Sequence, residues 1–224
     1  DDLEIKILLN DIKDNLSPEK LAELASRAIN KMSYDHQITY LLSNIKDNIS
    51  QDKLAELTFR AIDKMSYDNQ ITYLLDNIKD NLSPEKLEEL ASIAIEKTSV
   101  DYKIKDLLIG IKDNLSPEKL EKLASVAIEK MSDNIEIGNL LEEIKDNISQ
   151  DKLEKFASTA ISKMSIDISF RFLLNDIKDN LSQNKLEELA SVVINKMSDD
   201  LEIKILLNDI KDNLSPEKLA ELAS

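Results

Sequence analysis

Residues Ile12 to Glu19 read Ile-Lys-Asp-Asn-Leu-Ser-Pro-Glu, and this stretch decides the fold. Asn15 suits the left-handed position that follows the last turn of a helix, and Leu16 suits the apolar contact that comes after it. Ser17 is a favourable N-cap, Pro18 fits the first helical position, and an acid follows at the helix start. The stretch therefore predicts the end of one helix and the beginning of another.

Apolar residues on both sides of this stretch have helical spacing. Before it they are Ile5, Leu8, Leu9 and Ile12, and after it they are Leu21, Leu24, Ala25, Ala28, Ile29 and Met32. A Ser-x-Asp turn at Ser33-Tyr34-Asp35 then opens the next helix. The expected unit is an α-hairpin of two helices of about 12–16 residues joined by short turns.

The same punctuation recurs along the whole chain at a constant interval. Ile-Lys-Asp-Asn begins at residues 12, 45, 78, 111, 144, 177 and 210, each 33 after the last (45 − 12 = 33). The repeats are residues 2–34, 35–67, 68–100, 101–133, 134–166 and 167–199, with a partial copy at 200–224. Because one hairpin cannot bury its own apolar face, stacking is expected to give a single all-α solenoid over 1–224.

The chain also contains a second, longer repetition. Residues 1–26 and 199–224 are identical at every position, whereas neighbouring repeats differ at many. We interpret this identity as the duplication of a block of six repeats, so that the chain is expected to be part of a longer array. The alternative is an engineered protein whose end copies its start. Neither end carries the polar capping repeat that solenoids use, so end-to-end self-association through the terminal repeats is a further expectation.

Composition excludes several classes of function. The formal charge of −15, from 29 Lys and Arg against 44 Asp and Glu, disfavours nucleic acid and anionic membranes as partners. There is no Cys and one His, and no nucleophile–base set stands out, so neither an enzyme nor a cofactor is expected. No apolar run is long enough to cross a membrane, which leaves a cytoplasmic, a secreted or a bacterial-surface location open.

The apolar register resembles that of the tetratricopeptide repeat, a two-helix unit of nearly the same length. It is carried by Ile5, Leu8, Leu9, Ile12, Leu21, Ala25 and Ala28. The Trp and Leu-Gly signature of that family is missing, and Leu9 and Ala25 exchange the small and large positions. Ankyrin repeats share the period, but their Thr-Pro-Leu-His signature is absent.

Differences between the copies concentrate on the first helix of each repeat, at positions 2, 5, 6 and 9 counted from Asp2. The tetratricopeptide resemblance implies that positions 2, 5 and 9 line a concave groove that binds a protein or peptide. The candidate partner-binding residues are Leu3, Lys6, Asn10, His36, Thr39, Tyr40, Ser43, Asn69, Thr72, Tyr73, Asp76, Tyr102, Lys105, Ile109, Ile168, Arg171, Phe172 and Asn175. Alternatively, these positions vary because the core does not constrain them, and Tyr40, Tyr73 and Phe172 pack against the next repeat.

Three other features have plain structural explanations. The acidic loop after Asp11 lacks the glycine and the alternating oxygen ligands of a calcium site. His36 falls near a helix start, where exposure is the default, and the five Met residues have the spacing of a core, so no metal is expected. The lysines that precede Asp at 13, 46, 79, 112, 145, 178 and 211 are expected to form a charge-balanced, solvated rim.

Three functions follow from these observations as hypotheses. The first is a non-enzymatic scaffold that binds a protein through the variable face of the first helices. The second is a structural spacer within a large repeat protein, such as a bacterial surface or effector protein. The third, a nucleic-acid-reading array, is disfavoured by the acidic charge.

Overall fold

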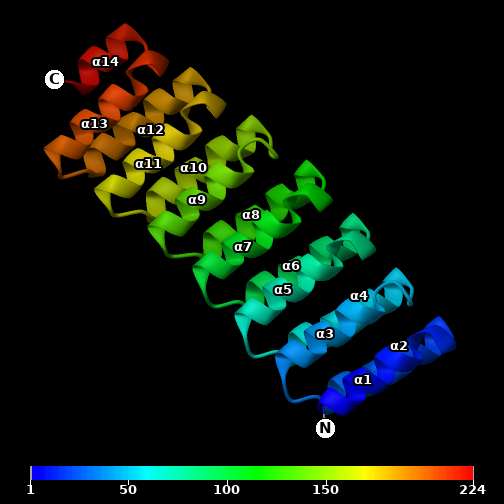
Figure 1. The fold of residues 1–224 in the computed structure, drawn as a ribbon. Helices are drawn as coiled ribbons and strands as arrows, with labels where there is room; N and C mark the ends of the chain where they lie inside the picture. Colours follow the sequence, from blue (N-terminus) through cyan, green and yellow to red (C-terminus); the bar gives the residue numbers. More distant parts are fainter. Residues whose placement is uncertain (1, 224) are drawn as a thin grey trace. The chain divides into compact units, whose positions relative to one another are not determined.

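The computed structural model describes residues 2–223, apart from the side chains of residues 2, 3, 5 and 6. The described chain is an array of α-hairpins without a β-strand, which confirms the all-α solenoid class (Figure 1). Contacts group it into two compact units, residues 1–119 and 120–224. The prediction of one array over 1–224 stays a prediction.

Unit 1 contains three complete hairpins and the first helix of a fourth. Its helices are α1 (Asp2–Ile12), α2 (Pro18–Lys31), α3 (Asp35–Ile45), α4 (Gln51–Lys64), α5 (Asp68–Ile78), α6 (Pro84–Lys97) and α7 (Asp101–Ile111). The first helices α1, α3, α5 and α7 pack in series, and the second helices α2, α4 and α6 form a parallel series beside them (Figure 1).

Unit 2 has the same plan. Helix α8 (Pro117–Lys130) contains the boundary between the units; it is followed by α9 (Asn134–Ile144), α10 (Gln150–Lys163), α11 (Asp167–Ile177), α12 (Gln183–Lys196), α13 (Asp200–Ile210) and α14 (Pro216–Leu222). Helices α9, α11 and α13 pack in series, as do α10, α12 and α14.

The helix starts agree with the expected capping. The hydroxyl oxygen of Ser17 accepts a hydrogen bond from the Lys20 backbone N–H at 3.3 Å, and the matching serines before α4, α6, α12 and α14 do the same. Ser149 is the exception: its hydroxyl donates to the Glu121 carboxylate at 2.6 Å. Local N-caps therefore start most of the second helices.

The expected helix ends are different in the structure. Among the described residues, no residue other than glycine has a positive φ, so the prediction of a left-handed Asn15 is wrong. The first helix instead tightens into a 3-10 turn at Lys13–Asn15, and Leu16 continues in an extended conformation. The asparagine of this turn bonds across repeats: Asn48 donates to the Asp14 carboxylate at 3.0 Å, and Asn81 to that of Asp47 at 2.7 Å.

The lysines expected to form a solvated rim instead connect neighbouring repeats. Lys13 donates to the Asn44 carbonyl at 3.0 Å, at the end of the next first helix. Lys46, Lys79, Lys145 and Lys178 donate in the same way to the carbonyls of Asn77, Gly110, Asp176 and Asp209. The rim prediction is wrong for these lysines, because their partners are the orphan carbonyls of a helix end about 31 residues away.

A second set of lysines caps the second helices. Lys64 donates to the carbonyls of Ile29 and Asn30 at 2.8 and 2.7 Å, at the end of α2. Lys97, Lys163 and Lys196 bond to the end of the preceding second helix in the same way. Each such lysine supplies a cation where the helix dipole is negative.

The core lies between consecutive hairpins and repeats from copy to copy. Leu41, Leu74, Leu107, Leu140, Leu173 and Leu206 are each at most 1% exposed. All five Met residues are buried, which confirms their assignment to the core, and Thr98 occupies the matching position in the remaining copy. No helix of the described residues has the length and apolar character that a membrane span requires.

Candidate functional site

The candidate residues lie on the first helices α1, α3, α5, α7 and α11. The side chains of Leu3 and Lys6 fall outside the described residues. Exposed side chains are those of His36, Tyr40, Asn69, Tyr73, Asp76, Tyr102, Ile168 and Phe172, and half-buried ones are those of Asn10, Ser43, Thr72, Lys105, Ile109, Arg171 and Asn175. We call the residues at positions 2, 5, 6 and 9 of the first helices the first-helix strip.

Thr39 differs from the other candidates. It is 1% exposed, and its hydroxyl has no hydrogen-bond partner. Its expected place on an exposed strip is therefore not observed. Neighbouring helices cover Thr39, whereas Thr72 at the same position of the next repeat is half-buried, and the long side chains of Lys105 and Arg171 remain 18% and 17% exposed.

A hollow of about 590 Å³ lies between α5 and α7 in unit 1. Five candidate residues line it, together with five that were not among the candidates, of which Asp106 also belongs to the first-helix strip. The lining residues are Asn69, Gln70, Thr72, Tyr73, Asp76, Lys103, Asp106, Leu107, Ile109 and Gly110. The strip is therefore recessed between repeats 68–100 and 101–133.

The hollow combines an aromatic edge with charged and amide groups. Tyr73 is 57% exposed at its rim. The Asp76 carboxylate pairs with Lys79 at 2.6 Å, and Lys103 lies 3.7 Å from the Asp106 carboxylate. A partner with both apolar and polar groups would find complementary contacts here.

Unit 2 contains a smaller hollow between α9 and α11, of about 260 Å³. Phe172 is the one candidate residue among those that line it. The lining residues are Asn134, Ile135, Gly138, Asn139, Ser169, Phe172, Leu173 and Asp176. Ile135 and Phe172 are 57% and 48% exposed, so the hollow has apolar edges.

Arg171 precedes Phe172 of this second hollow, and its guanidinium already contacts neighbouring side chains. Its Nε donates to the Glu202 carboxylate at 2.6 Å, and its guanidinium lies 3.8 Å from Asp209. The same guanidinium stacks 4.4 Å from the centre of the Phe172 ring. These contacts hold Phe172 at the surface and make Arg171 a positioning group rather than a free cation.

Both glycines of the chain line a hollow, and neither was among the candidate residues, although Gly138 is at position 5 of its first helix. Gly110 is in α7 and Gly138 in α9, and neither has a positive φ, so no turn requires them. A methyl group on Gly138 would lie 3.9 Å from the Met164 Cε, an ordinary contact. A sequence signal for these hollows was available, because a glycine inside an amphipathic helix lowers the stability of the helix and so needs a reason.

Replacing Gly138 by alanine is expected to raise the free energy of unfolding by about 0.5–1 kcal/mol, because alanine restricts the unfolded chain and fits the space. Urea unfolding followed by circular dichroism measures the change. Gly110→Ala is the matched control and should gain less, because its new methyl group would lie 3.4 Å from the Asp76 carboxylate. A loss of stability in Gly138→Ala would contradict the prediction.

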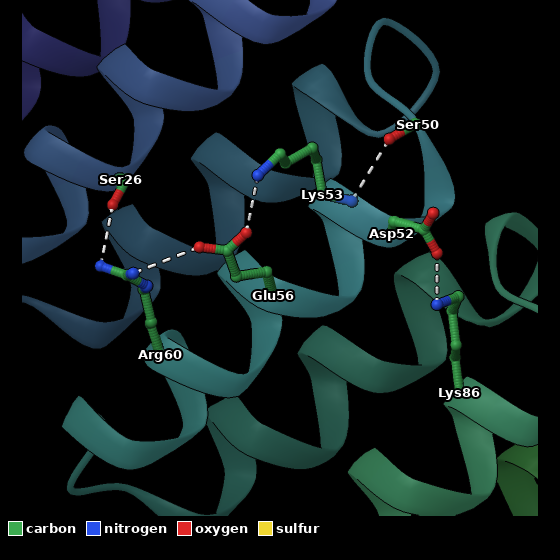
Figure 2. A network of polar contacts seen from close by, with 7 residues as sticks. All are labelled: Ser26, Ser50, Asp52, Lys53, Glu56, Arg60 and Lys86. Carbon is green, nitrogen blue, oxygen red and sulfur yellow. Dashed lines mark hydrogen bonds and ion pairs between the residues drawn. The ribbon is translucent and has the colours of Figure 1, made fainter.

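The second helices of unit 1 present a different surface. Arg60 of α4 donates to the Ser26 hydroxyl of α2 at 3.1 Å and pairs with Glu56 at 3.2 Å (Figure 2). Lys53 pairs with the other oxygen of Glu56 at 2.9 Å. Figure 2 shows these side chains pointing toward one another, so their charges are satisfied within the surface.

The electrostatics of this network follow from its contacts. The hydrogen bond from Lys53 lowers the pKa of Glu56, with smaller contributions from the charges of Lys53 and Arg60. The Lys86 ammonium of α6 lies 2.5 Å from Asp52 of α4 and holds the pKa of that carboxyl below its ordinary value (Figure 2). Lys53, Glu56, Arg60 and Asp52 are exposed and Lys86 is half-buried, so water screens these ion pairs and the network contributes little to stability.

No group of metal-ligating side chains occurs within residues 2–223. No family model matches the chain, and no curated protein matches it. Among solved structures, a chain from "Computational Design of Self-Assembling Cyclic Protein Homooligomers" is 12% identical, with 99% of this chain and 80% of that one covered, at a TM-score of 0.20. A likeness this low carries no argument about function.

Proposed function

We propose that the chain is a non-enzymatic binding array that holds a protein or peptide along the first-helix strip. The observation that carries the proposal is the hollow between α5 and α7, which lies at positions that vary between repeats while the core stays constant. The tetratricopeptide-like register supports the same face as the binding side. Exposed aromatic residues beside polar groups are typical of recognition surfaces.

Tyr73 is the residue on which this proposal depends most. It is 57% exposed at the rim of the hollow, where a partner could cover it completely. The side-chain amides of Asn69 and Gln70 lie in the same hollow, and they make no hydrogen bond within the described part of the chain. An amide both donates and accepts, so it can pair with the backbone of a bound peptide.

The alternative function is that of a structural spacer. It is favoured by the regular bonds between repeats, in which the same lysine and asparagine contacts recur in both units. Such contacts stiffen an array without making any surface specific. A nucleic-acid-binding array remains the least favoured function, because a charge of −15 opposes phosphate.

The Tyr73→Ala variant is expected to lose partner affinity by roughly tenfold or more, because a centrally placed aromatic residue commonly dominates an interface. Extracts of the native cell are passed over immobilised wild type and variants, and captured proteins are quantified by mass spectrometry. Phe59→Ala is the matched control, since Phe59 is 49% exposed but lies on the second helix α4.

Circular dichroism checks that both variants remain helical. A protein that the wild type and Phe59→Ala capture equally, and that Tyr73→Ala does not, supports the proposed function. If Tyr73→Ala captures the same proteins as the wild type, the strip is not the binding surface and the spacer function is favoured.

A further inference from the structure

Two neighbouring repeats of unit 1 share one exposed surface. Their first helices, α3 and α5, have 11 residues each and differ only at His36/Asn69 and Ser43/Asp76. The second helices of the same repeats, α4 and α6, differ at seven of 14 positions. This is the reverse of the trend along the chain, in which differences between copies concentrate on the first helices. Helices α3 and α5 therefore share exposed side chains that the packing of the core does not require.

The shared side chains include a pair of exposed tyrosines. Tyr40 of α3 and Tyr73 of α5 occupy the same position of their repeats and are 47% and 57% exposed. All five tyrosines of the chain lie within residues 34–102 of unit 1, and each is between 47% and 67% exposed. Because an aromatic ring buries a large apolar area when a partner covers it, this part of the surface is suited to recognition.

The separation of the two rings follows from the packing of the helices. Helix α3 packs on α5, and α5 packs on α7, as neighbours in one series (Figure 1). Packed helices lie about 8–10 Å apart, so equivalent positions of α3 and α5 are separated by about that distance. A polyproline II helix rises about 3.1 Å per residue with three residues per turn, or about 9 Å per turn. A peptide in this conformation that crosses the first helices would therefore place every third residue over a tyrosine.

Amide groups beside the rings can bind the backbone of such a peptide. A polyproline II helix has no internal hydrogen bonds, so its carbonyl oxygens need donors from elsewhere. The side-chain amides of Asn69 and Gln70 line the hollow between α5 and α7, next to Tyr73, and have no hydrogen-bond partner among the described residues. The hollow can therefore receive one turn of the peptide and donate hydrogen bonds to its carbonyl groups.

Contacts between the two repeats hold α5 at both of its ends. The Asp35 carboxylate of α3 accepts hydrogen bonds from the backbone N–H groups of Ser66 and Tyr67 at 2.8 Å, just before α5 begins. Lys46, which follows α3, donates to the Asn77 carbonyl at 2.6 Å, near the end of α5. The separation of the tyrosines is thus fixed before a ligand binds, which lowers the entropic cost of binding.

The charge of this surface favours a basic peptide. Helices α3 and α5 contain Asp35, Asp68 and Asp76 and no Lys or Arg. The lysines that follow them, Lys46 and Lys79, donate to carbonyl groups of the next first helix, and Lys79 also pairs with Asp76. The chain as a whole has a net charge of −15, so it attracts cationic partners at long range. An arginine between the prolines could also stack on a tyrosine ring.

We propose that α3 and α5 bind a basic, proline-rich peptide in the polyproline II conformation, with one turn of the peptide per repeat over Tyr40 and Tyr73. The inference names the class of partner for the first-helix strip, so it rests on the proposed function. Grooves lined by aromatic residues commonly bind such peptides, which are already ordered before they bind. A β-strand repeats one face about every 6.6 Å and an α-helix turns about every 5.4 Å, so both match the interval between first helices less well.

Fluorescence anisotropy with labelled peptides tests the inference on the full chain. The probe has four Pro-Pro-Arg triplets; one control has four Ala-Ala-Arg triplets, which keep the charge, and the other has four Pro-Pro-Glu triplets, which keep the conformation. We expect the probe to bind at least about tenfold more tightly than either control. Tyr40→Ala and Tyr73→Ala should each weaken its binding by roughly tenfold or more, whereas Phe59→Ala on α4 should bind it like the wild type.

Binding of the Ala-Ala-Arg peptide as tightly as the probe would overturn the inference, since charge alone would then explain it. So would unchanged binding of the probe by either tyrosine variant. Circular dichroism checks that the variants stay helical, and Tyr73→Lys, which repels the arginines of the probe, is a second variant at the same position. If Tyr73→Ala loses a protein captured from the native cell but the wild type does not bind the probe, this inference fails and the proposed function stands. If Tyr73→Ala captures the same proteins as the wild type, the proposed function itself fails.

Discussion

The Phe170→Ala variant is expected to lose about 3–5 kcal/mol of unfolding free energy, which is the range for removing a buried aromatic side chain. Phe170 is 1% exposed in α11 and is among the largest fully buried side chains. The Lys196 ammonium lies 5.2 Å from the centre of its ring, so the substitution also removes a cation–π contact. Urea unfolding measures the loss.

Phe170→Ile is the matched control, because isoleucine stands at the equivalent position in the other repeats, as at Ile38, Ile71, Ile104 and Ile137. We expect it to cost less than about 1.5 kcal/mol, since it keeps most of the buried apolar volume. Equal losses in the two variants would show that the aromatic ring, rather than the filled volume, holds α11 in place. A loss below about 1 kcal/mol in Phe170→Ala would contradict the prediction.

Local sequence signals predicted the hairpins well because a helix start is decided within one turn. Ser17 and Pro18 begin α2 where expected, and the apolar spacing predicted that Leu21, Ala25 and Ile29 would be buried. The helix ends were predicted less well. Asn15 does not take a left-handed conformation, because the chain tightens into a 3-10 turn and the equivalent asparagines bond to an aspartate 34 residues earlier.

The candidate binding site stays a prediction, and the hollows beside it were not expected from the sequence. Variation between repeats pointed to the first helices, and Tyr73 and Phe172 do lie at the edges of hollows there. Each hollow is lined by a glycine, Gly110 or Gly138, and lies between the first helices of two neighbouring repeats. The packing of neighbouring repeats could not be predicted from the positions alone. Thr39 shows that a variable position in the repeat need not be exposed, since neighbouring helices bury its short side chain.

Contacts between repeats escaped the sequence analysis for a physical reason. A lysine followed by an aspartate looks balanced by its neighbour, yet Lys46 donates to the Asn77 carbonyl instead. Carbonyls at a helix end lack a partner within their own helix, and a long flexible cation from the next repeat can reach them. The contacts between repeats therefore include backbone acceptors that the pattern of side chains in the sequence does not show.

Lys163→Met provides the sharpest test of this capping. The Lys163 ammonium donates to the carbonyls of Ile128, Glu129 and Met131 at 2.7, 2.7 and 2.5 Å, at the end of α8. Methionine keeps the apolar stem but removes all three bonds. We expect the free energy of unfolding to fall by about 1.5–3 kcal/mol, which is typical of hydrogen bonds to a charged group.

Lys152→Met separates capping from a general change in charge, because both variants remove one positive charge from a chain of net charge −15. Lys152 is exposed near the start of α10, where a cation opposes the helix dipole, so its loss should change stability by less than about 0.5 kcal/mol. Urea unfolding of the two variants at the same pH and salt concentration gives the comparison. Equal losses would mean that overall charge repulsion governs stability, whereas a loss confined to Lys163→Met shows that the lysine acts through the helix end it caps.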